Sequence, residues 1–190
     1  MTGIAAYVTM TGRVFAVALN QPLFGLYIPI IITIAQLLGT FISIPLLNFE
    51  LKWLNILGGF ACGMFDLLAA LFIVCFKKFD SFLDFGLPMT ALMITAFMFT
   101  FGLTLGTTVG PYMSQMMPSG ALWISQMINW VLIGVTLIAF SSNISSQGDP
   151  SIMLWVYAGF TLTISVLNCI FMIETKGKKV EYVQYKLAQD

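Results

Sequence analysis

Two charged residues, Asp66 and Arg13, lie inside long apolar stretches of the sequence. Asp66 lies in the run from 54 to 76, and Arg13 lies in the run from 1 to 19. A charge at membrane depth costs roughly 2.5–3.5 kcal/mol on insertion scales, so its presence indicates a function or a partner. Asp66 can carry a proton in a coupled transport step, or pair structurally with a polar group or another subunit. Arg13 can pair with Asp66 or extend to a membrane interface.

Amide side chains inside apolar runs form a second group of candidates. Amides in such runs are expected to find hydrogen-bond partners across helices. For Gln36 and Asn129, contact with a substrate is the alternative. The five amides are Gln36, Gln115, Gln126, Asn129 and Asn168.

The composition leaves little support for enzyme or metal chemistry. The chain has no His, which is the usual proton carrier near neutral pH and the commonest metal ligand. Its three cysteines are widely spaced in apolar runs, so Cys62, Cys75 and Cys169 are interpreted as buried side chains and not as a metal site. No pattern indicates an activated nucleophile, and the zero formal net charge gives no basic patch for nucleic acid. We expect neither an enzyme, nor a cofactor, nor a nucleic-acid partner.

The apolar runs predict an all-α, polytopic transmembrane helix bundle. Of the 190 residues, 59% are hydrophobic and 8% are charged, and the mean hydropathy is +0.95. Too few polar side chains are present to cover a surface facing water, so membrane lipids are the expected surroundings. A span needs about 20 apolar residues, and breaks at Pro, Gly, Asn and charges predict about six spans within residues 1–173. The spans are 1–19, 22–47, 54–76, 86–113, 120–141 and 151–173, followed by a polar tail over 174–190.

The positions of the basic residues predict the orientation. Lys52 falls on the same side as the lysines of the tail, whereas Lys77 and Lys78 fall on the opposite side. The side richer in Lys and Arg is normally the cytoplasmic side. We therefore expect the tail in the cytoplasm, or in the matrix if the membrane is the mitochondrial inner membrane; plasma membrane and mitochondrial membrane are both left open.

Glycines at intervals of four residues predict close helix contacts. Gly59 and Gly63 form one such pair, and Gly102, Gly106 and Gly110 form a series. Small residues let helix backbones approach closely in lipid. Bundle packing is one interpretation, and a groove beside a substrate path is the other.

Short motifs spread over nearly the whole chain resemble those of the sugar porters of the major facilitator superfamily. The tail motif resembles the Pro-Glu-Thr-Lys-Gly that closes the last helix of that family. The remaining motifs resemble parts of its seventh to eleventh helices, in the same order. In chain order the matches are Thr2-Gly3-Ile4, Gln36-x-x-x-Thr40, Gly58-Gly59, Tyr112-x-Ser114-Gln115-x-Met117-Pro118, Asn129-Trp130 and Glu174-Thr175-Lys176-Gly177.

The resemblance implies the fold of the C-terminal six-helix half of such a transporter, beginning partway along its seventh helix. It implies substrate contacts at Gln36, Asn129 and Trp130. The departures from the family are equally informative. Gln115 replaces the family Glu, and Lys52 is the single basic residue left in a loop that carries several in the family, so the ion pairs that latch these transporters are lost.

Three functions are compatible with these observations. We expect a transporter-derived, non-transporting accessory subunit of a larger membrane complex, in which other subunits cover the exposed half-interface; a mitochondrial respiratory or ATP synthase assembly is one such host. The alternative is a fragment of a functional hexose transporter, for which a sugar would be the ligand. A transporting homodimer is the third, because the halves of this superfamily are related by a pseudo-two-fold axis.

Overall fold

The computed structural model describes residues 22–48, 50–78, 83–117, 119–145 and 150–172. These residues form six helices joined by short connections. The first expected span, 1–19, and the expected tail, 174–190, lie outside the described residues, together with Arg13 and the motif Glu174-Thr175-Lys176-Gly177. The fold described below is therefore that of the last five expected spans.

The five later spans expected from the sequence all have helical counterparts. Five helical stretches are long and apolar enough to cross a membrane. Two of the helices begin at a proline, which suits the first helical turn because its φ is fixed and its missing N–H has no partner there. The helices are α2 (Pro22–Leu46), α3 (Leu51–Lys78), α4 (Leu83–Leu103), α5 (Leu105–Met116), α6 (Ser119–Ser145) and α7 (Pro150–Phe171).

One expected span is divided into two helices. The sequence predicts a single helix over residues 86–113, but α4 ends at Leu103 and α5 begins at Leu105. Between them Thr104 has φ −121° and ψ −86°, which are not helical values. The Thr104 hydroxyl donates to the carbonyl of Thr100 at 2.7 Å, and the amide of Thr108 donates to the carbonyl of Thr104 at 3.1 Å. These bonds satisfy polar groups on both sides of the break, so the irregular backbone is tolerated in an apolar setting.

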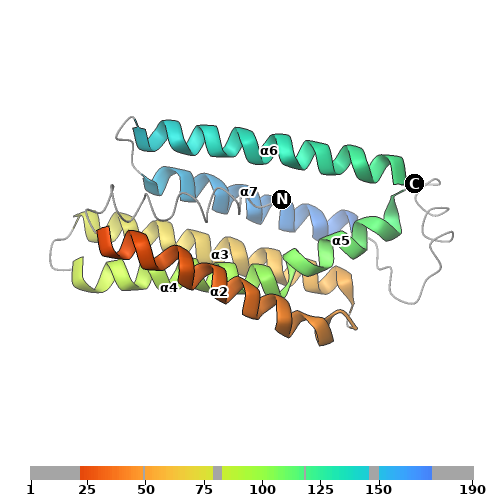
Figure 1. Ribbon diagram of the computed structural model, residues 1–190, viewed down its shortest axis with the longest axis horizontal. Coiled ribbons are helices and arrows are strands. Elements are labelled where there is room, and N and C mark those ends of the chain that lie inside the picture. The colour runs from red at the N-terminus through yellow and green to blue at the C-terminus, as the bar shows by residue number, and fades with distance from the viewer. Residues whose placement is uncertain (1–21, 49, 79–82, 118, 146–149, 173–190) are drawn as a thin grey trace.

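Helix α3 is the centre of the bundle. It packs along α7 on one side and along α4 on the other, and α4 in turn packs along α2 (Figure 1). Helix α5 leads from the end of α4 toward α6, which lies at the edge of the bundle (Figure 1). The buried core joins α2, α3, α4 and α7; its largest fully buried apolar side chains are Phe97, Ile32, Ile73 and Met98.

Glycines allow the closest approaches between helices. Where α2 crosses α4, a Cβ on Gly39 would collide with the backbone carbonyl of Phe99, and a Cβ on Gly102 would collide with the carbonyl of Gln36. Where α3 meets α7, Gly59 faces Ser165 and Gly63 faces Leu162. Gly59, Gly63 and Gly102 therefore serve bundle packing, because small residues let helix backbones approach closely in lipid.

The expectation for the other two glycines of the series was wrong. Gly106 lies against Phe101, which precedes the break in the same chain segment, and a Cβ on Gly110 would have no heavy atom within 4 Å. The break at Thr104 changes the direction of the chain, so the four-residue interval no longer keeps these glycines on the face that meets α2.

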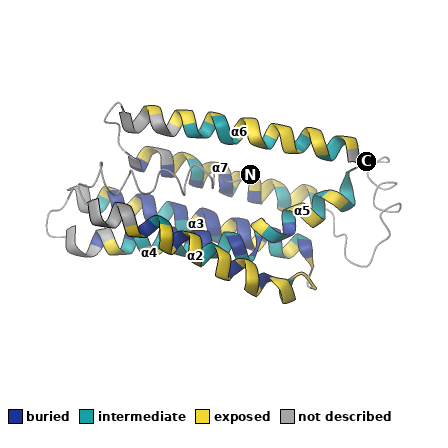
Figure 2. Ribbon diagram, in the orientation of Figure 1, coloured by how far each residue is buried: buried dark blue, intermediate teal, exposed yellow. Residues whose placement is uncertain are grey.

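The outward surface is apolar, as a lipid-facing surface should be (Figure 2). Large apolar side chains of α2 and α6 are exposed along most of their length, including Phe41 and Ile44 on α2 and Val131 and Ile138 on α6. Buried residues concentrate on α3 and on the faces of its neighbours (Figure 2). The chain is therefore an all-helical integral membrane protein.

We predict that Gly102→Ala destabilises the protein and that Gly110→Ala does not. The first substitution forces the α2 and α4 backbones apart, and overpacking of this kind costs about 1–3 kcal/mol. The second adds a methyl group in open space, where Ala is favoured over Gly in a helix by about 1 kcal/mol. The measurement is the free energy of unfolding in mixed micelles titrated with SDS. Equal changes in the free energy of unfolding for the two variants would contradict the close approach of α2 and α4 at Gly102.

Candidate functional site

The residues expected to contact a substrate lie on two helices with different neighbours. Gln36 is half-buried on α2, whose principal neighbour is α4. Asn129 is half-buried on α6 and Trp130 beside it is 64% exposed. Helix α6 makes limited contacts, with α5 and α7. The described residues therefore do not bring Gln36 into one packed site with Asn129 and Trp130, and a shared substrate site at these three residues stays a prediction.

On helix α6, Ser125, Asn129 and Thr136 form a narrow polar strip, called the polar face below, beside half-buried apolar residues such as Leu122 and Ile133. No residue from 120 to 139 is buried, so the whole span is accessible at least in part. Ser125, Asn129 and Thr136 recur at helical spacing on the side facing the bundle, whereas the exposed Gln126 lies one helical turn from Trp123 and from Trp130. Trp123 and Trp130 lie on the exposed side. The polar face is thus turned toward a region that the described helices fill only partly.

The amides of this region lack hydrogen-bond partners within the described part of the chain. The side chains of Gln36, Gln126 and Asn129 make no hydrogen bond to a described residue, and the same holds for Gln115 and Asn168. The expectation of partners across helices is therefore not met among residues 22–172 as far as they are described. An unsatisfied amide costs several kcal/mol in hydrocarbon, so these groups need water, a ligand or another polypeptide segment.

A different amide does pair across helices. Asn55, near the start of α3, accepts a hydrogen bond from the hydroxyl of Thr108 on α5 at 2.8 Å, and its amide nitrogen donates to the carbonyl of Leu51 at 3.0 Å. Both side chains are buried. The bond fixes α5 against α3 just beyond the break at Thr104. Sequence reasoning missed this pair because Asn and Thr have no distinctive spacing here and lie 53 residues apart.

Asp66 is buried inside the bundle, with 1% of its surface exposed. It lies one helical turn from Cys62 and interacts electrostatically with Cys62 and with Tyr157 of α7. For Asp66, structural pairing with a polar group and a role in proton transport both stay predictions. Its expected alternative partner, Arg13, lies outside the described residues.

The remaining motif residues take up local positions. The Ser114 hydroxyl donates to the carbonyl of Pro111 at 2.8 Å within α5, and Gln115 is half-buried in the next position. Lys52 is half-buried in the first turn of α3. In the described ranges no group of three or more His, Cys, Asp and Glu residues could hold a metal ion.

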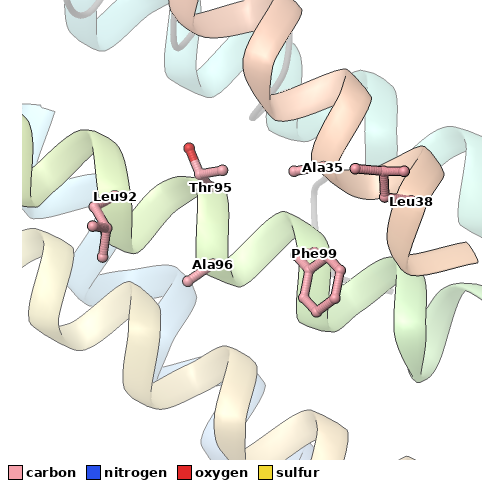
Figure 3. Close-up of a pocket in the computed structure, with 6 residues that line it drawn as sticks. All are labelled: Ala35, Leu38, Leu92, Thr95, Ala96 and Phe99. Atoms are coloured by element: carbon pink, nitrogen blue, oxygen red, sulfur yellow. The ribbon is translucent and has the colours of Figure 1, made fainter. Parts of the chain in front are cut away.

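A pocket of about 480 Å³ lies between α2 and α4 (Figure 3). Thr95 contributes its only hydroxyl group, and this hydroxyl already donates to the carbonyl of Ala91 at 2.8 Å. A sugar site needs several directed hydrogen bonds, which this lining does not offer. The lining residues are Ala35, Leu38, Leu92, Thr95, Ala96 and Phe99.

Comparison with known proteins connects the chain to a transporter. It is 22% identical over 183 residues to Hexose transporter 1 of Plasmodium vivax, and the match covers 94% of this chain and 35% of that transporter. The chain thus spans about a third of the length of this relative. No family model matches the sequence, and no solved structure matches it. The similarity and the five apolar helices together fit a transporter-derived membrane protein.

We predict that Thr108→Val destabilises the protein by about 1–3 kcal/mol, because it leaves the buried Asn55 amide oxygen without a donor. The double variant Asn55→Leu/Thr108→Val should recover part of this loss, since both polar partners are then removed. Thr95→Val is the matched control, because the Thr95 hydroxyl bonds only within its own helix. The unfolding free energies of the parent, Asn55→Leu, Thr108→Val and the double variant form a double-mutant cycle. Additive effects of the two single substitutions would argue against the interhelical bond.

Proposed function

We propose that this chain is a transporter-derived, non-transporting accessory subunit of a larger membrane complex. Its role is to present the polar face of α6, together with Gln36 of α2, to membrane helices of other subunits. This role needs no substrate path and no ion-pair latch, so it agrees with the presence of Gln115 where the sugar porters have Glu.

The observation that carries the proposal is the set of amides without partners in the described part of the chain. Gln126 is exposed on α6 and Asn129 is half-buried on the same helix. Hydrocarbon offers an amide no hydrogen bond, whereas a neighbouring transmembrane helix with an amide or hydroxyl group can offer one. The apolar lining of the pocket between α2 and α4 adds no competing polar site.

The similarity to a hexose transporter favours a second candidate. Because the match extends over 94% of this chain but 35% of the transporter, the chain can act as one part of a transporter whose other part lies elsewhere. In that case the amides of α2 and α6 would face a central cavity, and a hexose would take the place of the partner helix. The substrate site would then include Gln36, Asn129 and Trp130.

Native separation followed by an uptake assay distinguishes the two candidates. After extraction in mild detergent, an accessory subunit should migrate in a band much larger than 21.0 kDa with partner chains in fixed stoichiometry. Liposomes that contain the purified band should then take up no labelled hexose. Migration with a second six-helix bundle, together with saturable hexose uptake, would establish the transporter and overturn the accessory role.

We predict that Gln126→Leu/Asn129→Leu weakens partner association about eightfold, because an average interhelical hydrogen bond in a membrane is worth about 0.6 kcal/mol and two are removed. The measurement is the fraction of chain retained in the large band during detergent dilution. Thr163→Val on α7 is the control and should leave retention unchanged, because the Thr163 hydroxyl already donates to the carbonyl of Gly159 in its own helix. Unchanged retention in the double variant would show that partners bind elsewhere.

A further inference from the structure

The change of direction between α4 and α5 has no evident cause in the local sequence. Sharp bends in helices arise at proline, at Gly/Ser pairs, or where a side chain enters the backbone hydrogen-bond ladder. The break falls at Leu103-Thr104-Leu105, well before Pro111. The Thr104 hydroxyl does bond to the carbonyl four residues back, but the same bond at Thr95 leaves α4 unbroken. The cause of the break must therefore lie in contacts with other helices.

Helix α3 contacts the break at Gly58. The buried Thr104 lies directly against this glycine, so a Cβ at position 58 would collide with the hydroxyl oxygen and the Cβ of Thr104. On the other side of the break, the amide nitrogen of Leu103 lies close to Gly39 of α2. The break is thus enclosed between two helices, at positions where each helix has a glycine and no side chain.

One helical turn from Gly58, Asn55 holds the beginning of α5. The Thr108 hydroxyl has a single proton and two acceptors at 2.8 Å, the amide oxygen of Asn55 and the carbonyl of Thr104. The Thr104 carbonyl also accepts from the backbone amides of Thr107 and Thr108. The hydroxyl proton is therefore more useful at Asn55, where it connects α5 to α3.

We propose that Gly58 and Asn55 of α3 are positioning residues that set the direction of α5 and, through it, the place of α6. Gly58 receives Thr104 and so locates the break, whereas Asn55 holds Thr108 and so directs the helix beyond it. The two residues are three positions apart, so they lie on one face of α3. Without these contacts, α4 and α5 would form the single straight helix that the local sequence predicts.

The direction of α5 matters because α6 follows it almost immediately. Helix α5 ends at Met116 and α6 begins at Ser119, so the start of α6 lies where α5 brings it (Figure 1). This positioning role does not depend on whether a partner subunit or the other part of a transporter covers α6, and it goes beyond the proposed function.

The test measures distances by electron–electron double resonance between nitroxide labels on the full chain in nanodiscs. One pair of labels, at Leu92→Cys on α4 and Ser114→Cys on α5, spans the break at exposed positions. A continuous helix would separate these positions by about 33 Å, at about 1.5 Å per residue. The bent parent protein should therefore show one peak at a shorter distance.

A second pair of labels reports the place of α6. The labelled positions are Ile44→Cys on α2 and Ile124→Cys on α6, both of which are exposed. In every labelled protein Cys75 and Cys169 are replaced by Ser, whereas the buried Cys62 is retained.

In Asn55→Leu, the fraction of molecules at the straight-helix distance should rise about threefold, the change supported by one average interhelical hydrogen bond. In Gly58→Ala it should rise about tenfold, because the added methyl group displaces Thr104 from α3. Both variants should also broaden the distance distribution between α2 and α6. Gly110→Ala on α5 is the matched control and should leave both distributions unchanged, because no atom lies within 4 Å of the added methyl group.

Two rescue variants separate positioning from a general loss of stability. Gly58→Ala/Thr104→Gly removes the side chain that collides with the new methyl group, so it should restore the parental peak. Thr108→Ser keeps the hydroxyl group and should keep that peak, whereas Thr108→Val should lose it as Asn55→Leu does.

Two outcomes overturn the proposal. One is a parental distance distribution in Asn55→Leu protein that elutes as a single species; this variant decides the matter even where Gly58→Ala does not fold. The other is an equal change in Gly58→Ala and Gly110→Ala, because a higher helix propensity, and not the collision with Thr104, would then explain the effect.

Discussion

No water is available at the depth of the bilayer core, so every polar group there must be satisfied by protein, and most of this structure follows from that constraint. Hydroxyl groups within the spans donate back to carbonyls of their own helices, as Thr33 does to Pro29 and Ser165 to Thr161. The broken segment at Thr104 is possible because local bonds satisfy the groups on either side. Asn55 and Thr108 satisfy each other across helices. Five amides in the described part of the chain are exceptions, because their side chains have no described hydrogen-bond partner: Gln36, Gln115, Gln126, Asn129 and Asn168.

The second constraint is the distance between helix backbones. Without a hydrophobic driving force in lipid, association depends on close packing, and glycine is the residue that permits it. Gly39 with Gly102 and Gly59 with Gly63 bring α2, α4, α3 and α7 together. Helix α6 has no comparable glycine contact among the described helices. Close contacts thus join α2, α3, α4 and α7, whereas α6 packs lightly against α5 and α7.

The two candidate functions differ in what covers helix α6, a helix of another subunit or the other part of a transporter. The similarity to a hexose transporter extends along nearly the whole chain, but it covers about a third of that protein. The proposed accessory role and the alternative, a part of a hexose transporter, both fit this similarity.

The sequence alone determined that the chain is a helical membrane protein, because runs of about 20 apolar residues have no other stable form. It also located the helices from Pro22 to Phe171 to within a few residues, and identified Gly59, Gly63 and Gly102 as contact residues, because their spacing is a local property. Only the tertiary structure divided the span at Thr104, paired Asn55 with Thr108, and enclosed Asp66 beside Tyr157. These features depend on which helix lies next to which, and residues far apart in the chain carry no local pattern that records their neighbours. For the same reason the sequence named Gln36, Asn129 and Trp130 together, whereas the fold placed them on helices that do not share a packed site.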